Sequence, residues 1–189
     1  QNNGGAISIR KINSQPATLL LSGPAAGVGT LNYLSSNTGL KNFISMEIGG
    51  TSCDVILMSN ANATSTDHLI IDGYYLGLPS VDVHTVGAGG GTIAGVDKAG
   101  MLFVGPKGAG AKPGPACYNL GGNFPTITDA QLVLGRLAPG SYADGTIQMD
   151  LDLAKNSIKK FIADKLGLSV EEASIGIIRL MNQKLLNAV

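Results

Sequence analysis

Two apolar runs flank a short segment in which glycine, hydroxyl and acidic residues are concentrated. The runs are "KNFISM" at 41–46 and "VILM" at 55–58, and the segment between them includes "EIGGTSCD" at 47–54. Short apolar runs around a Gly-Gly pair are typical of two strands joined by a tight turn. The sequence therefore predicts a strand–turn–strand with Gly49 and Gly50 at its tip, which commits the middle of the chain to a sheet.

The chemistry of this segment has two interpretations. In the first, it is a plain hairpin turn that uses Gly-Gly at positive φ. In the second, it binds phosphate, because glycines let backbone N–H groups approach phosphate oxygens closely and Thr51 and Ser52 add hydroxyl donors. Glu47 and Asp54 would then hold Mg²⁺, usually through water, or orient an attacking water. The local pattern alone leaves both interpretations open.

Composition excludes several classes of function. Apolar residues make up 44% of the 189 residues, charged residues make up 14%, and the formal net charge is zero. A balanced charge favours neither nucleic acid nor an anionic membrane, and no apolar run approaches the ~20 residues that a membrane span needs. The two cysteines fit neither a metal-ligand spacing nor a disulfide framework. We expect a cytoplasmic protein that binds no nucleic acid and no membrane.

Strands dominate the expected structure of the first two thirds of the chain. A hairpin is expected over 91–105, with residues 97–100 as its turn. One helix is expected to begin at Ser22 or Gly23 and to close at Gly39. The other expected strands are "ISIRKIN" at 7–13, the beginning of "PATLLLSG" at 16–23, both runs within 41–59, and several within 68–86.

The last third is expected to be helical. A helix within 125–137 is predicted to have Thr128 as N-cap with Gln131 completing a capping box, and a second capping box is predicted at Ser169 with Glu172. An amphipathic helix within 152–167 should end at Gly167. Residues 105–125 are rich in Gly and Pro, so they should be irregular and partly mobile. The fold class is therefore α/β, β-rich over 1–125 and helical over 126–189.

Two further groups of residues are candidates for a binding site. Asp82 and His84 alternate along one strand, so both could face the same side and bind substrate or a second divalent metal, or simply form a polar strand face. The cluster Gly89, Gly90 and Gly91 could let substrate approach the backbone, or form a strand-to-helix turn. This cluster lacks the third glycine of a dinucleotide-binding fingerprint and the Gly-Lys-Ser/Thr end of a Walker A loop.

Residues in the long loop and beside it have ordinary interpretations. Lys107 and Lys112 could contact phosphate, although most such lysines are simply solvated. Cys117 is expected to be a plain thiol, and Asp129 is expected to support the start of a helix through its charge.

Five blocks in order carry a resemblance to a known family. They are "LSGPAAGV", "EIGGTSCDV", "VDVHTVGAGGGTIAGVD", "FVGPKGAGAKPGPACY" and "PTITDAQLVLGRL". Together they resemble the A subunit of the hydantoinase/oxoprolinase family, from about residue 18 to residue 189. The family includes hydantoin-hydrolysing enzymes, 5-oxoprolinase and subunits of acetone or acetophenone carboxylase. The resemblance implies a ribonuclease-H-like domain of the actin, Hsp70 and sugar-kinase type of ATPase.

The resemblance also implies roles for the residues of the glycine segment. Gly49, Gly50, Thr51 and Ser52 would form the second phosphate-binding hairpin, and Asp54 would be catalytic and hold Mg²⁺. The family usually has Asp where this chain has Glu47, and Thr where it has Cys53. The first departure lengthens the carboxylate arm by one methylene.

The resemblance further implies a fragment of the second ATPase domain, which would hold one wall of the nucleotide cleft. The family's first phosphate motif and its adenosine segment have no counterpart here, so these 189 residues alone are expected to bind ATP weakly. The implied function is ATP-dependent hydrolysis of a cyclic amide with a B-type partner subunit or domain. The alternatives are a subunit of a ketone carboxylase, or a non-catalytic assembly or regulatory module on the same fold.

Overall fold

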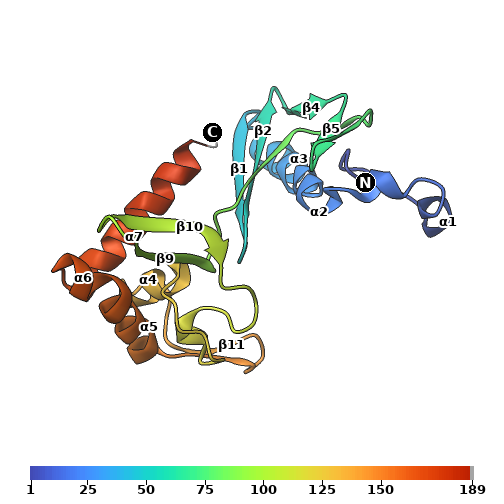
Figure 1. Cartoon of the computed structure of the whole chain (residues 1–189). Helices are drawn as coiled ribbons and strands as arrows, with labels where there is room; N and C mark the ends of the chain where they lie inside the picture. The colour runs from blue at the N-terminus through green and yellow to red at the C-terminus, as the bar shows by residue number, and fades with distance from the viewer. Residues whose placement is uncertain (188–189) are drawn as a thin grey trace. The chain divides into compact units, whose positions relative to one another are not determined.

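The computed structural model describes residues 1–187, and these form two compact units (Figure 1). The first unit comprises Gln1–Glu47 and Asp54–Thr85. The second comprises Ile48–Cys53 and the chain from Val86 onward. Both units combine helices with strands, so the expected α/β class is confirmed at this level.

The first unit is built on a sheet that contains the predicted hairpin. Its strands are β1 (Phe43–Ile48), β2 (Cys53–Ser59), β3 (Asn62–Ala63) and β8 (Val83–Val86), in the order β1-β2-β3 with β8 also paired to β2. Strand β2 is the most buried, because its Ile56 and Met58 belong to a core that also contains Leu31 of α3 (Gly27–Thr38). As predicted, this helix ends at Gly39, whose φ of 73° suits glycine.

Two small hairpin-like pairs complete the strands of the first unit. Strand β5 (Leu69–Ile71) pairs with β6 (Tyr74–Leu76), and β4 (Ser65–Thr66) pairs with β7 (Ser80–Val81). These pairs confirm that strands occur within 68–86.

The second unit joins a two-stranded ribbon to a group of helices. Strand β9 (Thr92–Val96) runs antiparallel to β10 (Leu102–Gly108), and the Asp97 carboxylate accepts the N–H groups of Ala99 and Met101 in the turn, as the predicted hairpin requires. Helix α7 (Val170–Leu186) packs against β10, where Lys184 donates to the carbonyl of Val104. The helical elements are α4 (Ile127–Val133), α5 (Leu151–Ile158), a π-helical segment (Lys159–Ala163), α6 (Asp164–Leu166) and α7 (Val170–Leu186).

The expected division into a β-rich and a helical part is less sharp than the sequence indicates. Helix α3, with the short α1 (Ile9–Ile12) and α2 (Ser22–Ala25), lies within 1–125, whereas β11 (Gly140–Tyr142) and β12 (Ile147–Met149) form a hairpin within 126–189. The predicted end of a helix at Gly167 and the capping box of Ser169 with Glu172 are both confirmed.

Two strand predictions near the N-terminus are wrong. Residues 9–12 form one turn of helix, since the Ile-rich segment has no neighbouring strand among the described residues and Ile9 is exposed. Residues 16–19 form a 3₁₀ helix, because Pro16 at its first position has the fixed φ of a helical turn and lacks an N–H that would go unpaired.

The predicted N-cap of α4 is also wrong. The cap is Thr126, whose side chain and backbone form a capping box with Asp129. Two overlapping boxes were available in this sequence, and the one with a carboxylate forms, since hydrogen bonds to an ionised acceptor are stronger than those to an amide.

The long loop is shorter than predicted. Residues 105–108 continue β10, and residues 116–118 form a 3₁₀ turn (Ala116–Tyr118), so the irregular parts are 109–115 and 119–125. Among the described residues, no helix combines the length and apolar character needed to cross a membrane.

Candidate functional site

The glycine segment forms the predicted turn between β1 and β2. The N–H of Gly49 donates to the carbonyl of Ser52 at 2.8 Å, which closes the loop. Neither Gly49 nor Gly50 has a positive φ. The plain two-residue hairpin turn, which requires positive φ, is therefore not the reason for glycine here.

Close packing within the second unit explains the neighbouring glycine cluster. The N–H groups of Gly90 and Gly91 donate to the carbonyls of Gly49 and Gly50, at 2.9 and 2.7 Å. A β-carbon on Gly89 would lie 2.7 Å from the Gly49 oxygen, and one on Gly91 would lie 2.9 Å from the Gly50 oxygen. The chain's own turn therefore occupies the space at these glycines, which lead into β9 and not into a helix.

Helix α4 holds this glycine cluster from its other side. Both the N–H and the hydroxyl of Thr128 donate to the carbonyl of Gly90, at 2.8 and 2.9 Å. Sequence reasoning assigned Thr128 to a cap and so missed this contact. We call residues 89–91 together with Thr128 the brace of the turn.

The turn itself keeps several donors unused. The N–H groups of Gly50, Thr51 and Ser52 and the two hydroxyls donate to no acceptor among residues 1–187. Gly50 and Thr51 are exposed, and a β-carbon on Gly50 would meet nothing within 4 Å. Backbone donors that are fixed in place and open to solvent are suited to binding an anion.

Asp54 lies on β2 in the first unit and has a defined partner. One of its carboxylate oxygens accepts the Thr85 hydroxyl of β8 at 2.6 Å, and its other oxygen accepts nothing within the part of the chain that the structure describes. The sequence gives no indication that Thr85 belongs to the site. The pair leaves a half-buried carboxylate with one oxygen held and one available.

Glu47 has a different environment. It is exposed near the end of β1, its carboxylate lies against Gly27 of α3, and it makes no hydrogen bond or ion pair with residues 1–187. Of the two predicted carboxylates, Asp54 is held by a hydrogen bond, whereas the position of Glu47 depends on its close approach to Gly27.

Asp82 and His84 are both exposed, in the last segment of the chain that belongs to the first unit. Asp82 lies between β7 and β8, where its N–H donates to the Thr64 carbonyl at 2.9 Å, and His84 lies within β8. Among the described residues, no group of three or more His, Cys, Asp or Glu side chains could hold a metal ion. Their role in binding stays a prediction.

Asp129 has a larger structural role than the sequence indicated. Its buried carboxylate accepts the N–H groups of Cys117 and Thr126 and the Thr126 hydroxyl at 2.7–2.8 Å, with a longer bond from the Ala116 N–H at 3.3 Å. These bonds fasten the long loop to α4.

Burial, with Asp129 beside it, raises the pKa of the Cys117 thiol, which keeps this thiol protonated. That agrees with the expectation of an unreactive thiol.

The structure is that of a mixed α/β protein with a braced glycine turn. Comparison with known proteins shows the family to which the chain belongs. The chain belongs to the hydantoinase/oxoprolinase family, whose model matches residues 1–189. The resemblance that the five sequence blocks carry is thereby confirmed.

Three relatives illustrate the range of this family. The caprolactamase alpha subunit of Pseudomonas jessenii is 39% identical over the whole of this chain, and the acetophenone carboxylase gamma subunit of Aromatoleum aromaticum is 37% identical, also over the whole chain. A nucleotide-free structure of an ATP-dependent acetone carboxylase matches 97% of the chain with a TM-score of 0.86 at 35% identity. The chain spans only 26–27% of the length of these proteins.

Proposed function

We propose that the chain is part of an ATP-dependent hydrolase of cyclic amides of the hydantoin or 5-oxoproline type, and that its glycine turn binds nucleotide phosphate. The observation that carries this proposal is the set of unused donors at Gly50, Thr51 and Ser52, held by the brace of the turn. Pre-positioned donors lose little freedom when a phosphate binds.

The residues of the turn and of β2 have distinct tasks in this proposal. The three N–H groups and the hydroxyls of Thr51 and Ser52 donate to phosphate oxygens. Asp54, oriented by Thr85, uses its second oxygen to hold the water shell of Mg²⁺ or an attacking water. Positioning and neutralisation of phosphate charge are the main contributions a protein makes to phosphoryl transfer.

The proposed chemistry converts an inert amide into a reactive one. Transfer of a phosphoryl group from ATP to the amide oxygen makes the amide carbon more electrophilic, so that one water adds to this carbon and the ring nitrogen leaves with a proton. The resulting acyl phosphate is hydrolysed by a second water to the carboxylate and phosphate. The net reaction consumes ATP and two waters, and yields ADP, phosphate and the ring-opened product. The same activation applied to an enol oxygen would serve carboxylation of a ketone.

The relatives support both chemistries. One is named for caprolactam, a cyclic amide, and others are named for acetone and acetophenone carboxylation. We favour hydrolysis because several relatives are named for cyclic amides, namely the caprolactamase subunit and the 5-oxoprolinases of three organisms. Names such as alpha, beta and gamma subunit also support a partner subunit, for which we propose a hydantoinase B type. We also propose that the chain is a fragment of the second ribonuclease-H-like domain of an ATPase of the actin, Hsp70 and sugar-kinase type.

Phosphate release from the full-length protein, with its partner subunit, tests this function. Release from Mg-ATP should rise severalfold with caprolactam, hydantoin or 5-oxoproline, and not with acetone or acetophenone plus bicarbonate. Asp54→Asn should abolish the stimulation, and Thr85→Val should weaken it. Asp72→Asn, in the exposed turn between β5 and β6, is the matched control and should match the unmodified protein.

Other outcomes would replace the proposal. Stimulation by ketones plus bicarbonate alone would establish a carboxylase. Absence of Mg-ATP binding by the assembled protein would establish a non-catalytic module.

A further inference from the structure

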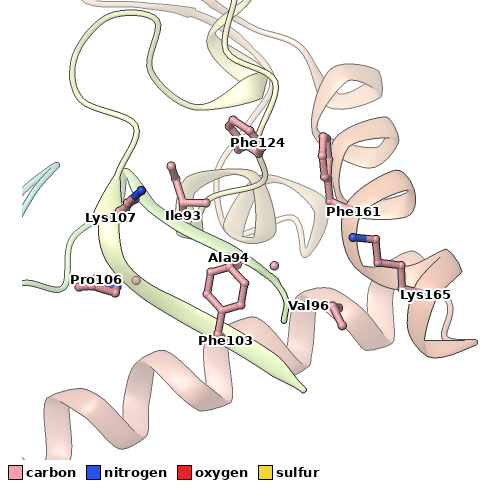
Figure 2. Close-up of a pocket in the computed structure, with 11 residues that line it drawn as sticks. Ile93, Ala94, Val96, Phe103, Pro106, Lys107, Phe124, Phe161 and Lys165 are labelled. Carbon is pink, nitrogen blue, oxygen red and sulfur yellow. The ribbon is translucent and has the colours of Figure 1, made fainter. Parts of the chain in front are cut away.

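The second unit contains a cavity that shares no residue with the glycine turn. It has a volume of about 650 Å³ and lies between the β9–β10 ribbon and the segment around Phe161, as Figure 2 shows. This volume falls within the range of about 300–1,000 Å³ that small-molecule sites occupy. Its lining is Ile93, Ala94, Gly95, Val96, Phe103, Gly105, Pro106, Lys107, Phe124, Phe161 and Lys165.

Three aromatic rings give the cavity its apolar character. The rings of Phe124 and Phe161 lie 5.2 Å apart between centroids and are tilted by 50°, and Phe103 rises from β10 opposite them (Figure 2). Phe103 is 37% exposed and Phe124 is 53% exposed. Covering these rings with an apolar group would remove their surface from water, which is favourable.

Gly95 on β9 leaves room for the Phe103 ring, which lies against its backbone at one wall of the cavity. A β-carbon on Gly95 would lie 2.7 Å from the Phe103 ring. The ring therefore lies directly over the β9 backbone and forms a flat apolar surface for another ring or an alkyl chain.

The charges at the rim have one sign. Lys107 comes from β10 and Lys165 from α6, on different sides of the cavity (Figure 2), and the lining contains no carboxylate. Neither ammonium group forms an ion pair within residues 1–187, whereas the nearby Asp164 is already paired with Lys159 at 2.5 Å. A third cation, the Lys160 ammonium, lies 5.3 Å from the centroid of the Phe161 ring.

We propose that this cavity binds an organic monoanion, a carboxylate carried on an aryl or alkyl body. The body packs among Phe103, Phe124 and Phe161, and the carboxylate accepts hydrogen bonds from Lys107 or Lys165. A metal cation is excluded by the absence of acidic ligands from the lining, and the apolar walls disfavour a sugar or a free phosphate. This site goes beyond the proposed function and does not depend on it.

Two probes with the same phenylalkyl body, one ending in a carboxylate and one in a neutral hydroxyl, test the proposal. The full-length protein is titrated with 4-phenylbutyrate and with 4-phenylbutanol by calorimetry, without nucleotide. The carboxylate should bind at one site about tenfold more tightly than the alcohol, the expected gain from one partly exposed charge-assisted hydrogen bond. Lys107→Gln combined with Lys165→Gln should remove the difference, and Phe161→Leu should weaken both probes.

A matched variant and a separate readout keep the result interpretable. Lys98→Gln, an exposed lysine in the β9–β10 turn outside the cavity, should leave both affinities unchanged. Equal affinity for the two probes, no saturable binding, or an equal effect of Lys98→Gln would each overturn the proposal. Mg-ATP binding by the same variants should be unchanged, so failure at the glycine turn is distinguishable from failure here.

Discussion

The carboxylate of Glu47 lies against Gly27, the first residue of α3, so closely that a β-carbon on Gly27 would be 2.0 Å from Oε1. The same β-carbon would be 3.3 Å from Cδ1 of Ile56 in the core. The beginning of a helix favours a negative charge. The glutamate at position 47 is therefore accommodated because its neighbour, Gly27, has no side chain.

Gly27→Ala should displace Glu47 with little cost to the fold. The clashing atom is the end of an exposed side chain that can move, and alanine is the better helix former by about 1 kcal/mol, so the free energy of unfolding should change by no more than about 1 kcal/mol. If Glu47 positions Mg²⁺, the Mg²⁺ concentration needed for ATP turnover should rise severalfold. Adding Glu47→Asp should restore it, because the shorter arm avoids the new methyl group. An unchanged Mg²⁺ requirement in Gly27→Ala would remove Glu47 from the site.

Gly89→Ala and Gly91→Ala should disrupt the turn. Each new β-carbon would meet backbone atoms of the turn at 2.7–2.9 Å, and backbone yields less readily than a side chain. We expect a loss of about 1–3 kcal/mol in unfolding free energy and at least a tenfold loss in Mg-ATP affinity, measured by denaturant titration and calorimetry. Gly87→Ala is the control in the same segment, since a β-carbon there meets nothing within 4 Å. If all three variants behave alike, the brace has no role in binding.

Asp129→Asn should loosen the long loop. The carboxylate accepts four hydrogen bonds, and an amide has only one acceptor oxygen and would turn its NH₂ towards some of the donors. The expected loss of stability is about 3 kcal/mol, with faster amide hydrogen exchange in residues 116–126. Asp144→Asn, exposed in the β11–β12 turn, should change neither quantity.

Cys117 should make the protein less stable at alkaline pH. Burial raises the pKa of its thiol, so above the unfolded-state pKa of about 8.5 the unfolded chain loses a proton that the folded chain keeps. Unfolding free energy should then fall with rising pH, by up to about 1.4 kcal/mol per pH unit from this group. Denaturation curves between pH 7.5 and 10 should show a shallower decline for Cys117→Ala. Rapid alkylation of Cys117 by iodoacetamide in the folded protein would contradict this account.

Local sequence signals predicted the parts of the structure that depend on neighbouring residues. The hairpin around Gly49, the helix end at Gly39 and the capping box at Ser169 each depend on residues a few positions apart. The N-cap of α4 is different, because the box of Thr126 with Asp129 forms in place of the predicted one, and the Thr128 hydroxyl instead donates to Gly90, 38 positions away.

The contacts of the candidate site that the sequence does not predict join distant segments. Thr85 on β8 donates to Asp54 on the paired strand β2. Gly90 and Gly91, about 40 positions later in the sequence than the turn, donate to its carbonyls. A glycine cluster indicates that something approaches the backbone closely, but the pattern does not distinguish a ligand from another part of the same chain.

The brace also fixes when the turn can acquire its shape during synthesis. Residues 49–52 leave the ribosome well before Gly90, and Thr128 follows another 38 positions later. Until those residues emerge, the hairpin has its strands but nothing to hold the carbonyls of Gly49 and Gly50. Contacts between distant residues form late because closing the loop costs entropy first. A nascent chain halted before residue 128 would therefore contain the complete glycine motif, but its turn would lack the hydrogen bonds from Thr128 to Gly90 that complete the brace.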